Sequence, residues 1–480
     1  MELVEATREF VRIEEKYDLD SIEINGVAVW RYLRPGLAVA TQSAVDGSAN
    51  SNSVETTGFS KKKVLKSILT NTISRPPLVN KNVDILYYGF PRRMRLQDGY
   101  FWDKYFEHFN QETEYRHSWL EDPHVYRSNL ELAEFHDKPP KTNWLSYTDP
   151  VHFLPRLMRY SGITDRLPIP RFSLPQKLVA AIGEFEDTFG VSIDTQQRVK
   201  RTLHRHAIEK PFYKWVIDRS NPDILLLVQR IGKEPLLEVC DQENVPVVEF
   251  QQGAITNAAV AGRHPIQSNP KNFPDFFFTF GDYWTDRLQL PISDDRVISV
   301  GWPFLEEVSK KSNSQPGRRN SILFLSQPAV GNKLANLAYD LSRVVDSEFE
   351  IVFRPHPGRR DAVSKFYPQL INSEVVLNTD TSLYEQFRSS CIQVGVGSTA
   401  LFEGLRFGLE TFLVGGFAEE YTVGLSELGL ATHVNSVNEL VTLIEKSSGV
   451  TRDKTVDYVF EPGSIRNIQR EIDTILSEWD

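Results

Sequence analysis

Short apolar runs alternate with longer amphipathic stretches over most of the chain. Runs rich in Val, Ile, Leu and Phe predict buried strands at residues 83–88, 223–228, 245–250, 276–280 and 297–300. A long helix is expected over 196–217. Continuous apolar strands separated by helices are typical of a parallel sheet that is covered on both faces.

The alternation restarts more regularly after a polar break at 309–319. The pattern predicts strands at 322–325, 350–353, 375–377, 391–396 and 411–414, with helices at 333–345, 362–371, 383–388 and 400–407. Such a βαβ series with short loops indicates a doubly wound domain. The predicted class is therefore α/β, with two Rossmann-like domains that face a cleft and are joined near residues 303–317.

The chain before the first of these strands has a different pattern. Residues 22–37 combine a turn at Asn25-Gly26 with an amphipathic segment, and residues 41–60 are rich in Ser, Asn, Thr and Gly. The first predicts a small element packed on the main body, and the second a flexible linker. The expected division is a helical element with its linker, two Rossmann-like domains and a final helix, at residues 1–75, 76–305, 306–460 and 461–480.

Composition narrows the class of protein. The 480 residues are 40% hydrophobic and 25% charged, which excludes a fibrous or wholly disordered chain. The net charge of −10 argues against a nucleic-acid partner. Cys240 and Cys391 cannot form a disulfide framework or a zinc site. With a charged N-terminus and no apolar run near the ~18 residues of a membrane span, we expect a cytoplasmic protein that could still work at a membrane surface.

The sharpest motif is Arg354-Pro355-His356-Pro357-Gly358, directly after a predicted strand. Ligands of open parallel sheets lie beyond the carboxyl ends of the strands. The prolines stiffen this turn, and an imidazole there can donate to a phosphate oxygen while neighbouring arginines add positive potential. The alternative is a rigid loop with a solvated histidine.

A second motif, Gly395-Val396-Gly397-Ser398-Thr399, joins the strand at 391–396 to a helix. Its glycines permit a close backbone approach, and Ser398 can cap the helix, whose N-terminus favours an anion. No Lys follows and a third Gly is missing, so it is neither a P-loop nor a dinucleotide fingerprint. An ordinary capped helix is the alternative, but His356 nearby favours a phosphate site. Glu403, one turn on, is a ribose acceptor or a solvated carboxylate.

The other half of the chain offers candidates for the opposite side of the cleft. Gln251, Gln252 and Gly253 end one strand and open a polar loop that reaches His264. Amide groups that only cap a loop are nearly as good an interpretation. Asp98 follows the first strand among three arginines, which would keep it ionised as a general base. A turn Asp before Gly is the plainer alternative.

Together these segments resemble the GT-B capsule and lipopolysaccharide glycosyltransferases of bacteria, including the sialyl- and Kdo-transferase groups. The resemblance covers about residues 245–415 and rests on VPVVEFQQG, PDFFFTFGDYW, VISVGWPF, RPHPG and GVGSTALFEGLRFG. It implies that residues 306–460 bind the donor and residues 76–305 the acceptor. It also implies that His356 with Pro357, and Ser398 with Thr399, hold the donor phosphate.

Two departures from the family pattern concern the acceptor side. Such proteins often have Gln-His-Gly where this chain has Gln251-Gln252-Gly253. The sialyltransferase motif of two acidic residues and Gly is only half matched, by Gln97-Asp98-Gly99.

The resemblance implies transfer of a sugar from a nucleotide-sugar donor, with a CMP-sugar favoured, to a cell-surface polysaccharide or glycolipid. The reaction would be metal-independent and inverting, with no bound cofactor, and Asp98 and His356 as the catalytic candidates. Glu249 or His264 would be the next candidates for the base. Such an enzyme would sit in the cytoplasm or at the inner membrane. The alternatives are a CDP-polyol phosphotransferase of the teichoic-acid type and a non-catalytic nucleotide-sugar-binding protein.

Overall fold

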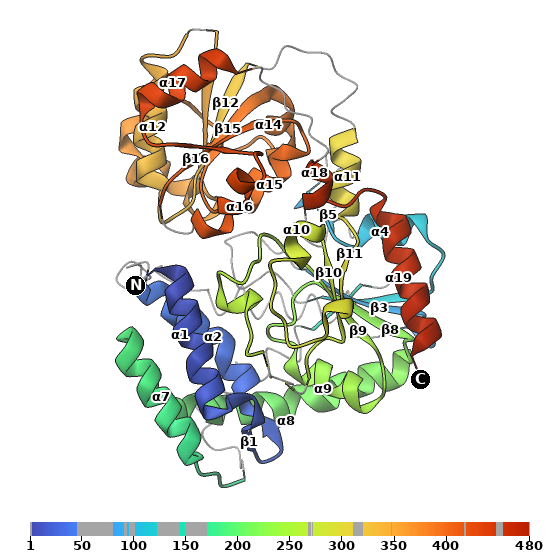
Figure 1. Ribbon diagram of the computed structural model, residues 1–480. Coiled ribbons are helices and arrows are strands. Elements are labelled where there is room, and N and C mark those ends of the chain that lie inside the picture. Colours follow the sequence, from blue (N-terminus) through green and yellow to red (C-terminus); the bar gives the residue numbers. More distant parts are fainter. Residues whose placement is uncertain are drawn as a thin grey trace.

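The computed structural model describes most of the chain in a series of ranges. They are residues 2–45, 80–90, 94–95, 101–121, 145–148, 170–266, 270, 272–310, 320–346, 348–416, 419–447 and 455–479. Within them, two large parallel sheets form two α/β domains, and a helical group adjoins the first (Figure 1).

The helical group brings together segments from two parts of the chain. It contains α1 (Leu3–Tyr17), a β1–β2 hairpin (Glu23–Ile24 and Val27–Ala28), α2 (Val29–Val45) and α7 (Gln176–Phe189). Asn25 and Gly26 both have positive φ angles, 53° and 77°, as the predicted turn requires. Phe10, Trp30 and Phe185 pack together in its core. The prediction that a linker begins at residue 41 is wrong, because α2 continues to Val45. The rest of the predicted linker, residues 46–60, lies outside the described residues.

The first large sheet has seven parallel strands in the order β11-β10-β9-β8-β3-β6-β7. In chain order they are β3 (Ile85–Gly89), β6 (His117–Glu121), β7 (Leu145–Tyr147), β8 (Ile224–Leu227), β9 (Val247–Phe250), β10 (Phe276–Thr279) and β11 (Val297–Ser299). Its helices are α4 (Glu107–Glu112), α8 (Thr195–Ser220), α9 (Glu234–Gln242), α10 (Asp282–Thr285) and α11 (Pro303–Lys310). The predicted strands are confirmed, and the buried runs of β3, β8 and β9 explain the continuous apolar pattern.

The second sheet has six parallel strands in the order β14-β13-β12-β15-β16-β17. They are β12 (Ser321–Leu325), β13 (Glu350–Arg354), β14 (Val376–Leu377), β15 (Ser390–Gly395), β16 (Glu410–Val414) and β17 (Thr432–Val434). The helices are α12 (Gly331–Ser342), α14 (Leu383–Ser389), α15 (Thr399–Leu405), α16 (Val423–Glu427) and α17 (Val437–Lys446). In both sheets the first strand is central, which is the doubly wound order.

One predicted helix of this domain, at 362–371, is wrong. The segment consists of short pieces, η8 (Pro357–Ala362), α13 (Val363–Phe366) and η9 (Pro368–Leu370). Pro368 lacks the N–H that a continuous helix needs at this position.

The end of the chain returns to the first domain. After α18 (Thr455–Val459), helix α19 (Ser464–Glu478) lies beside α4 of the first domain (Figure 1). Its side chains Ile468, Ile472 and Ile475 are buried there. The hydroxyl of Tyr115 donates to Asp473 at 2.6 Å. The expected C-terminal helix is therefore present and packs on the first domain. None of the described helices is long and apolar enough to cross a membrane.

The carboxyl ends of the two sheets meet at the domain boundary. Beyond β9, the amide of Ala254 donates to Oγ1 of Thr399, which lies beyond β15, at 2.9 Å. Trp284 of the first domain packs on Phe402 of the second, with ring centroids 4.6 Å apart. The two Rossmann-like domains thus face each other in the predicted GT-B arrangement.

The helical group depends on a buried ion pair between α1 and α2. Arg34 donates to both carboxylate oxygens of Glu14, at 2.6 and 3.0 Å, and Trp30 donates to the same carboxylate at 2.7 Å. The two charged side chains are only 7% and 1% exposed.

We expect Glu14→Gln to lower the free energy of unfolding by about 3–5 kcal/mol, because it leaves a buried guanidinium without its counter-charge. Urea unfolding followed by tryptophan fluorescence measures the change. The matched control is Glu9→Gln on the same helix, whose exposed pair with Arg12 should contribute at most about 1 kcal/mol. Equal losses in the two variants would contradict the importance of the buried pair.

Candidate functional site

The strand order marks one crevice in each domain. In a doubly wound sheet, ligands bind where neighbouring strands lead to opposite sides, outside the carboxyl ends. In the second domain this point lies between β12 and β15, and in the first between β3 and β8. The predicted site residues that the structure describes lie near these two crevices or in a separate group.

His356 follows β13, the strand next to β12. Its Nδ1 accepts a hydrogen bond from the amide of Gly358 at 3.2 Å, so the ring proton of the neutral form lies on Nε2. The backbone thus orients the half-buried imidazole and makes Nε2–H a donor. Pro357 opens the short helix η8 directly after it.

Arg354 has a different environment from His356, although it is two residues away. Its guanidinium is buried and donates to Asn378 Oδ1 at 2.9 Å and to the carbonyl of Thr381 at 2.7 Å. Burial, with a smaller contribution from Arg360, lowers its pKa to about 10. Arg354 therefore stabilises the loop after β14.

The loop after β15 holds the predicted phosphate-binding residues. The amide of Gly397 donates to Thr422 Oγ1 at 3.4 Å, and Ser398 caps α15 by accepting from the amide of Ala400 at 3.3 Å. Thr399 accepts from Ala254 across the domain boundary. Ser398 keeps its hydroxyl proton for donation, whereas Thr399 already joins the two domains.

Glu403 is buried at the domain boundary. It forms a hydrogen bond with Tyr384, whose hydroxyl also accepts from Lys104 Nζ of the first domain at 3.4 Å. Its Oε2 has no hydrogen-bond partner among the described residues. Burial raises the pKa of Glu403, and the charge of Lys104 opposes this only in part. The carboxylate is thus desolvated, with one oxygen still able to accept a hydroxyl.

The glutamines after β9 build the loop that meets this cluster. Gln251 is fully buried, donates to the carbonyl of Gly253 at 2.8 Å and accepts from the amide of Phe280 at 2.8 Å. The carbonyl of Gln252 accepts from Tyr105. A Cβ on Gly253 would lie 2.9 Å from Thr399 Oγ1, so this position needs glycine for the close approach of the domains.

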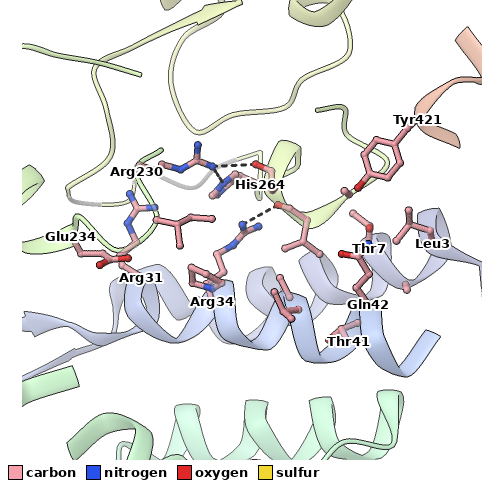
Figure 2. A pocket seen from close by; sticks show the side chains of 18 of the residues that line it. Leu3, Thr7, Arg31, Arg34, Thr41, Gln42, Arg230, Glu234, His264 and Tyr421 are labelled. Atoms are coloured by element: carbon pink, nitrogen blue, oxygen red, sulfur yellow. Dashed lines mark hydrogen bonds between the residues drawn. The ribbon is translucent and has the colours of Figure 1, made fainter. Parts of the chain in front are cut away.

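His264 and Glu249 belong to a separate group. Glu249 accepts from the Arg230 guanidinium at 2.6 Å and from the Arg230 amide at 3.0 Å. His264, 1% exposed, lines a cavity of about 180 Å³ with Arg31 and Arg34 of α2 and Arg230 (Figure 2). Burial and the charges of these three arginines lower the pKa of His264 well below its usual value.

Asp98, the predicted base, lies outside the described residues. Asp103, in the described segment that follows, accepts from the amides of Phe90, Tyr105 and Phe106 at 2.8–3.2 Å. It therefore ties this segment to the end of β3. In the described part of the chain, no group of three His, Cys, Asp or Glu residues could hold a metal ion.

Several polar residues at these sites were not predicted from the sequence. Lys104 and Tyr384 lie far from Glu403 along the chain, so no local pattern connects them. One feature of the sequence could have indicated Arg31 and Arg34. Arginines three positions apart share a helix face, and these two interrupt the otherwise apolar segment WRYLRPGL.

No protein-family model and no curated protein matches the chain. Among solved structures, the UDP-GlcNAc 2-epimerase of Methanocaldococcus jannaschii, in complex with UDP-GlcNAc and UDP, is similar at a TM-score of 0.46 and 10% identity. That match covers 81% of this chain and 99% of the epimerase. The wall teichoic acid polymerase TagF is similar at a TM-score of 0.41 and 10% identity, over 87% of this chain and 94% of the polymerase. A lipopolysaccharide outer core galactosyltransferase, WaaB, is similar at a TM-score of 0.41 and 9% identity. That match covers 81% of this chain and 99% of the galactosyltransferase.

We expect Glu403→Gln to stabilise the protein increasingly as pH rises above about 4.3, the ordinary value for Glu. A raised pKa means that the folded state holds the proton more tightly, so the wild type loses stability as this carboxyl ionises. Urea unfolding at a series of pH values from 5 to 8 measures the difference. Glu374→Gln, an exposed change in the same domain, should show little such trend. A constant difference for Glu403→Gln would contradict the desolvated carboxylate.

Proposed function

We propose that this chain is a glycosyltransferase that moves a sugar from a nucleotide-sugar donor to a hydroxyl of a cell-surface polysaccharide or glycolipid. The observation that carries the proposal is the oriented imidazole of His356 beside the β12–β15 crevice, with Ser398 across it. Strands about 4.8 Å apart place the ends of β13 and β15 roughly 10 Å from each other, a span that a nucleotide phosphate with its ribose can bridge.

The reaction follows from the charges that must be stabilised. The acceptor oxygen bonds to the anomeric carbon while the bond from that carbon to the phosphate oxygen breaks, and the nucleotide leaves with the electron pair. His356 Nε2–H and the Ser398 hydroxyl would donate to the leaving phosphate. The acceptor proton would pass to a base, for which Asp98 is the candidate. We propose transfer without a metal and with inversion.

A buried carboxylate at the boundary suits the donor ribose. Glu403 has an oxygen without a partner among the described residues, which a ribose hydroxyl would satisfy. Because Lys104 and Tyr384 cover it, we propose that the donor enters as the domains separate and is enclosed as they close. A CMP-sugar remains the favoured donor. Incubation with CMP-sugars, UDP-sugars and CDP-glycerol separates sugar transfer from polyol-phosphate transfer, and binding without turnover would favour a non-catalytic protein.

We expect His356→Ala to weaken the binding of the matching nucleotide about tenfold or more, since a charge-assisted hydrogen bond contributes roughly 1.5–3 kcal/mol. A thermal-shift screen with CMP, CDP, UDP and GDP first selects the nucleotide, because a bound ligand stabilises the folded state. Calorimetry then compares the variants. His433→Ala removes an exposed histidine of the same domain and should bind as the wild type does. Unchanged affinity in His356→Ala would show that His356 does not bind the nucleotide phosphate.

We expect Asp98→Asn to lose about 10²–10⁴ of the transfer rate, which is the usual contribution of a general base. Nucleotide affinity should stay at the wild-type value, because a base for the acceptor does not contact the donor phosphate. Single-turnover assays measure the rate, and calorimetry the affinity. A folded variant with the native rate would make Asp98 a turn residue.

A further inference from the structure

The arginine-lined cavity is built from three parts of the molecule. Helices α1 and α2 form one wall, and the loops after β8 and β9 form another. Tyr421 of η10 (Glu419–Tyr421) adds a side chain from the second domain (Figure 2). Arg230 follows β8, one of the two strands at the crevice of the first domain. The cavity therefore lies beside the place where that fold binds ligands.

One end of the cavity is strongly positive. Arg31, Arg34 and Arg230 converge there with His264 (Figure 2). Arg34 is paired with Glu14 and Arg230 with Glu249. Burial lowers the pKa of Arg31 to about 9, because the nearby carboxylates of Asp20 and Glu234 offset the cost only in part.

Among the described residues that line the cavity, Glu234 is the one with a carboxylate, and it also contacts groups outside the cavity. Glu234 pairs with Arg205 at 3.0 Å and accepts from the amide of Gly232 at 2.9 Å. Arg205, which is not among the residues that line the cavity, therefore balances part of this charge, and the rest acts on Arg31.

The tautomer of His264 points to a missing acceptor. Its Nε2 lies 3.5 Å from the Arg230 guanidinium, which can only donate, so Nε2 accepts and the ring proton is on Nδ1. Nδ1 is buried and has no hydrogen-bond partner among the described residues. Leaving such a donor unsatisfied costs about 1–3 kcal/mol. An oxygen of a ligand would satisfy it.

The other end of the cavity suits a sugar ring. Thr41, Gln42 and Tyr421 lie there, away from the arginines, with apolar side chains such as Leu3 (Figure 2). Hydroxyl and amide groups can hydrogen-bond sugar hydroxyls, and an aromatic face can pack on the ring. The volume of about 180 Å³ has room for one such unit.

We propose that this cavity binds an acidic sugar unit, whose carboxylate or phosphate meets the guanidinium of Arg31 and Nδ1–H of His264. Resting on the proposed function, this unit belongs to the acceptor, and the acceptor is therefore an anionic glycan. The sugar ring lies toward Gln42 and Tyr421, so the site includes side chains of the helical group and of the second domain.

Binding of small probes to the full chain tests this site. Calorimetry with glucuronate, glucose 6-phosphate and neutral glucose should show binding of at least one acid and much weaker binding of glucose. Whichever acid binds more tightly identifies the anion as carboxylate or phosphate. Arg31→Gln should weaken that binding tenfold or more, as expected for a lost charge-assisted hydrogen bond. Arg12→Gln, an exposed arginine of α1 outside the cavity, should leave it unchanged.

A second pair of variants keeps the test sharp if Arg31→Gln folds poorly. Val39 lines the cavity and is 64% exposed, so charges are tolerated there. Val39→Glu should weaken the binding of the acid about three- to tenfold, and Val39→Lys should strengthen it, because a charge at the rim acts on the anion through partly screened electrostatics. Glucose bound as tightly as both acids, or acid binding that neither Val39 variant alters, would overturn the proposal.

The same variants separate this site from the donor site. Arg31→Gln should bind the nucleotide selected by thermal shift with wild-type affinity, since Arg31 lies in the helical group and His356 in the second domain. Acid binding without nucleotide binding would defeat the proposed function and leave the anion site standing. Nucleotide binding without acid binding would leave the proposed donor site standing and overturn the anion site.

Discussion

Every strand of the two large sheets runs parallel to its neighbours, and the positions of both candidate sites depend on this constraint. Parallel strands require crossovers that cover both faces of the sheet, so polar loops collect at the strand ends. The carboxyl ends then bring together side chains that are distant in the chain. In this molecule the two such edges face each other, which sets His356 and Ser398 in one domain and Arg230 and His264 in the other on either side of one boundary.

The fold was largely predictable because burial on both faces leaves a signal in each strand. Runs such as the one at β8 read directly as parallel strands, and the turn at Asn25-Gly26 followed from its residues. The misses have physical causes. Strand β6 was not predicted, because its sequence HSWLE contains polar residues and lacks a continuous apolar run. Its last four residues are nevertheless buried. Helix α2 continues through polar residues that resemble a linker in sequence, because the helix packs against α8, α1 and α7.

The candidate sites divide along the same line. Candidate residues in loops that follow strands could be predicted from the sequence, because a motif such as the one around His356 consists of adjacent residues. Partners across the boundary could not: Lys104 and Glu403 are joined only by the docking of two domains. The structure also adds orientation that residue type alone lacks. Gly358 fixes the tautomer of one histidine and Arg230 that of another, so the same side chain becomes a donor through different nitrogens.

Because helix α19 belongs to the first domain but comes last in the chain, the second domain can complete its fold before the first during synthesis. A nascent chain leaves the ribosome from its N-terminus, and domains generally fold as they emerge. The second domain is continuous, from β12 to α17, and can close once those residues are out. The first domain still lacks Ile468, Ile472 and Ile475, so the apolar side chains that pack against them stay exposed to solvent. The domain that is begun first is therefore the last to bury all of its core.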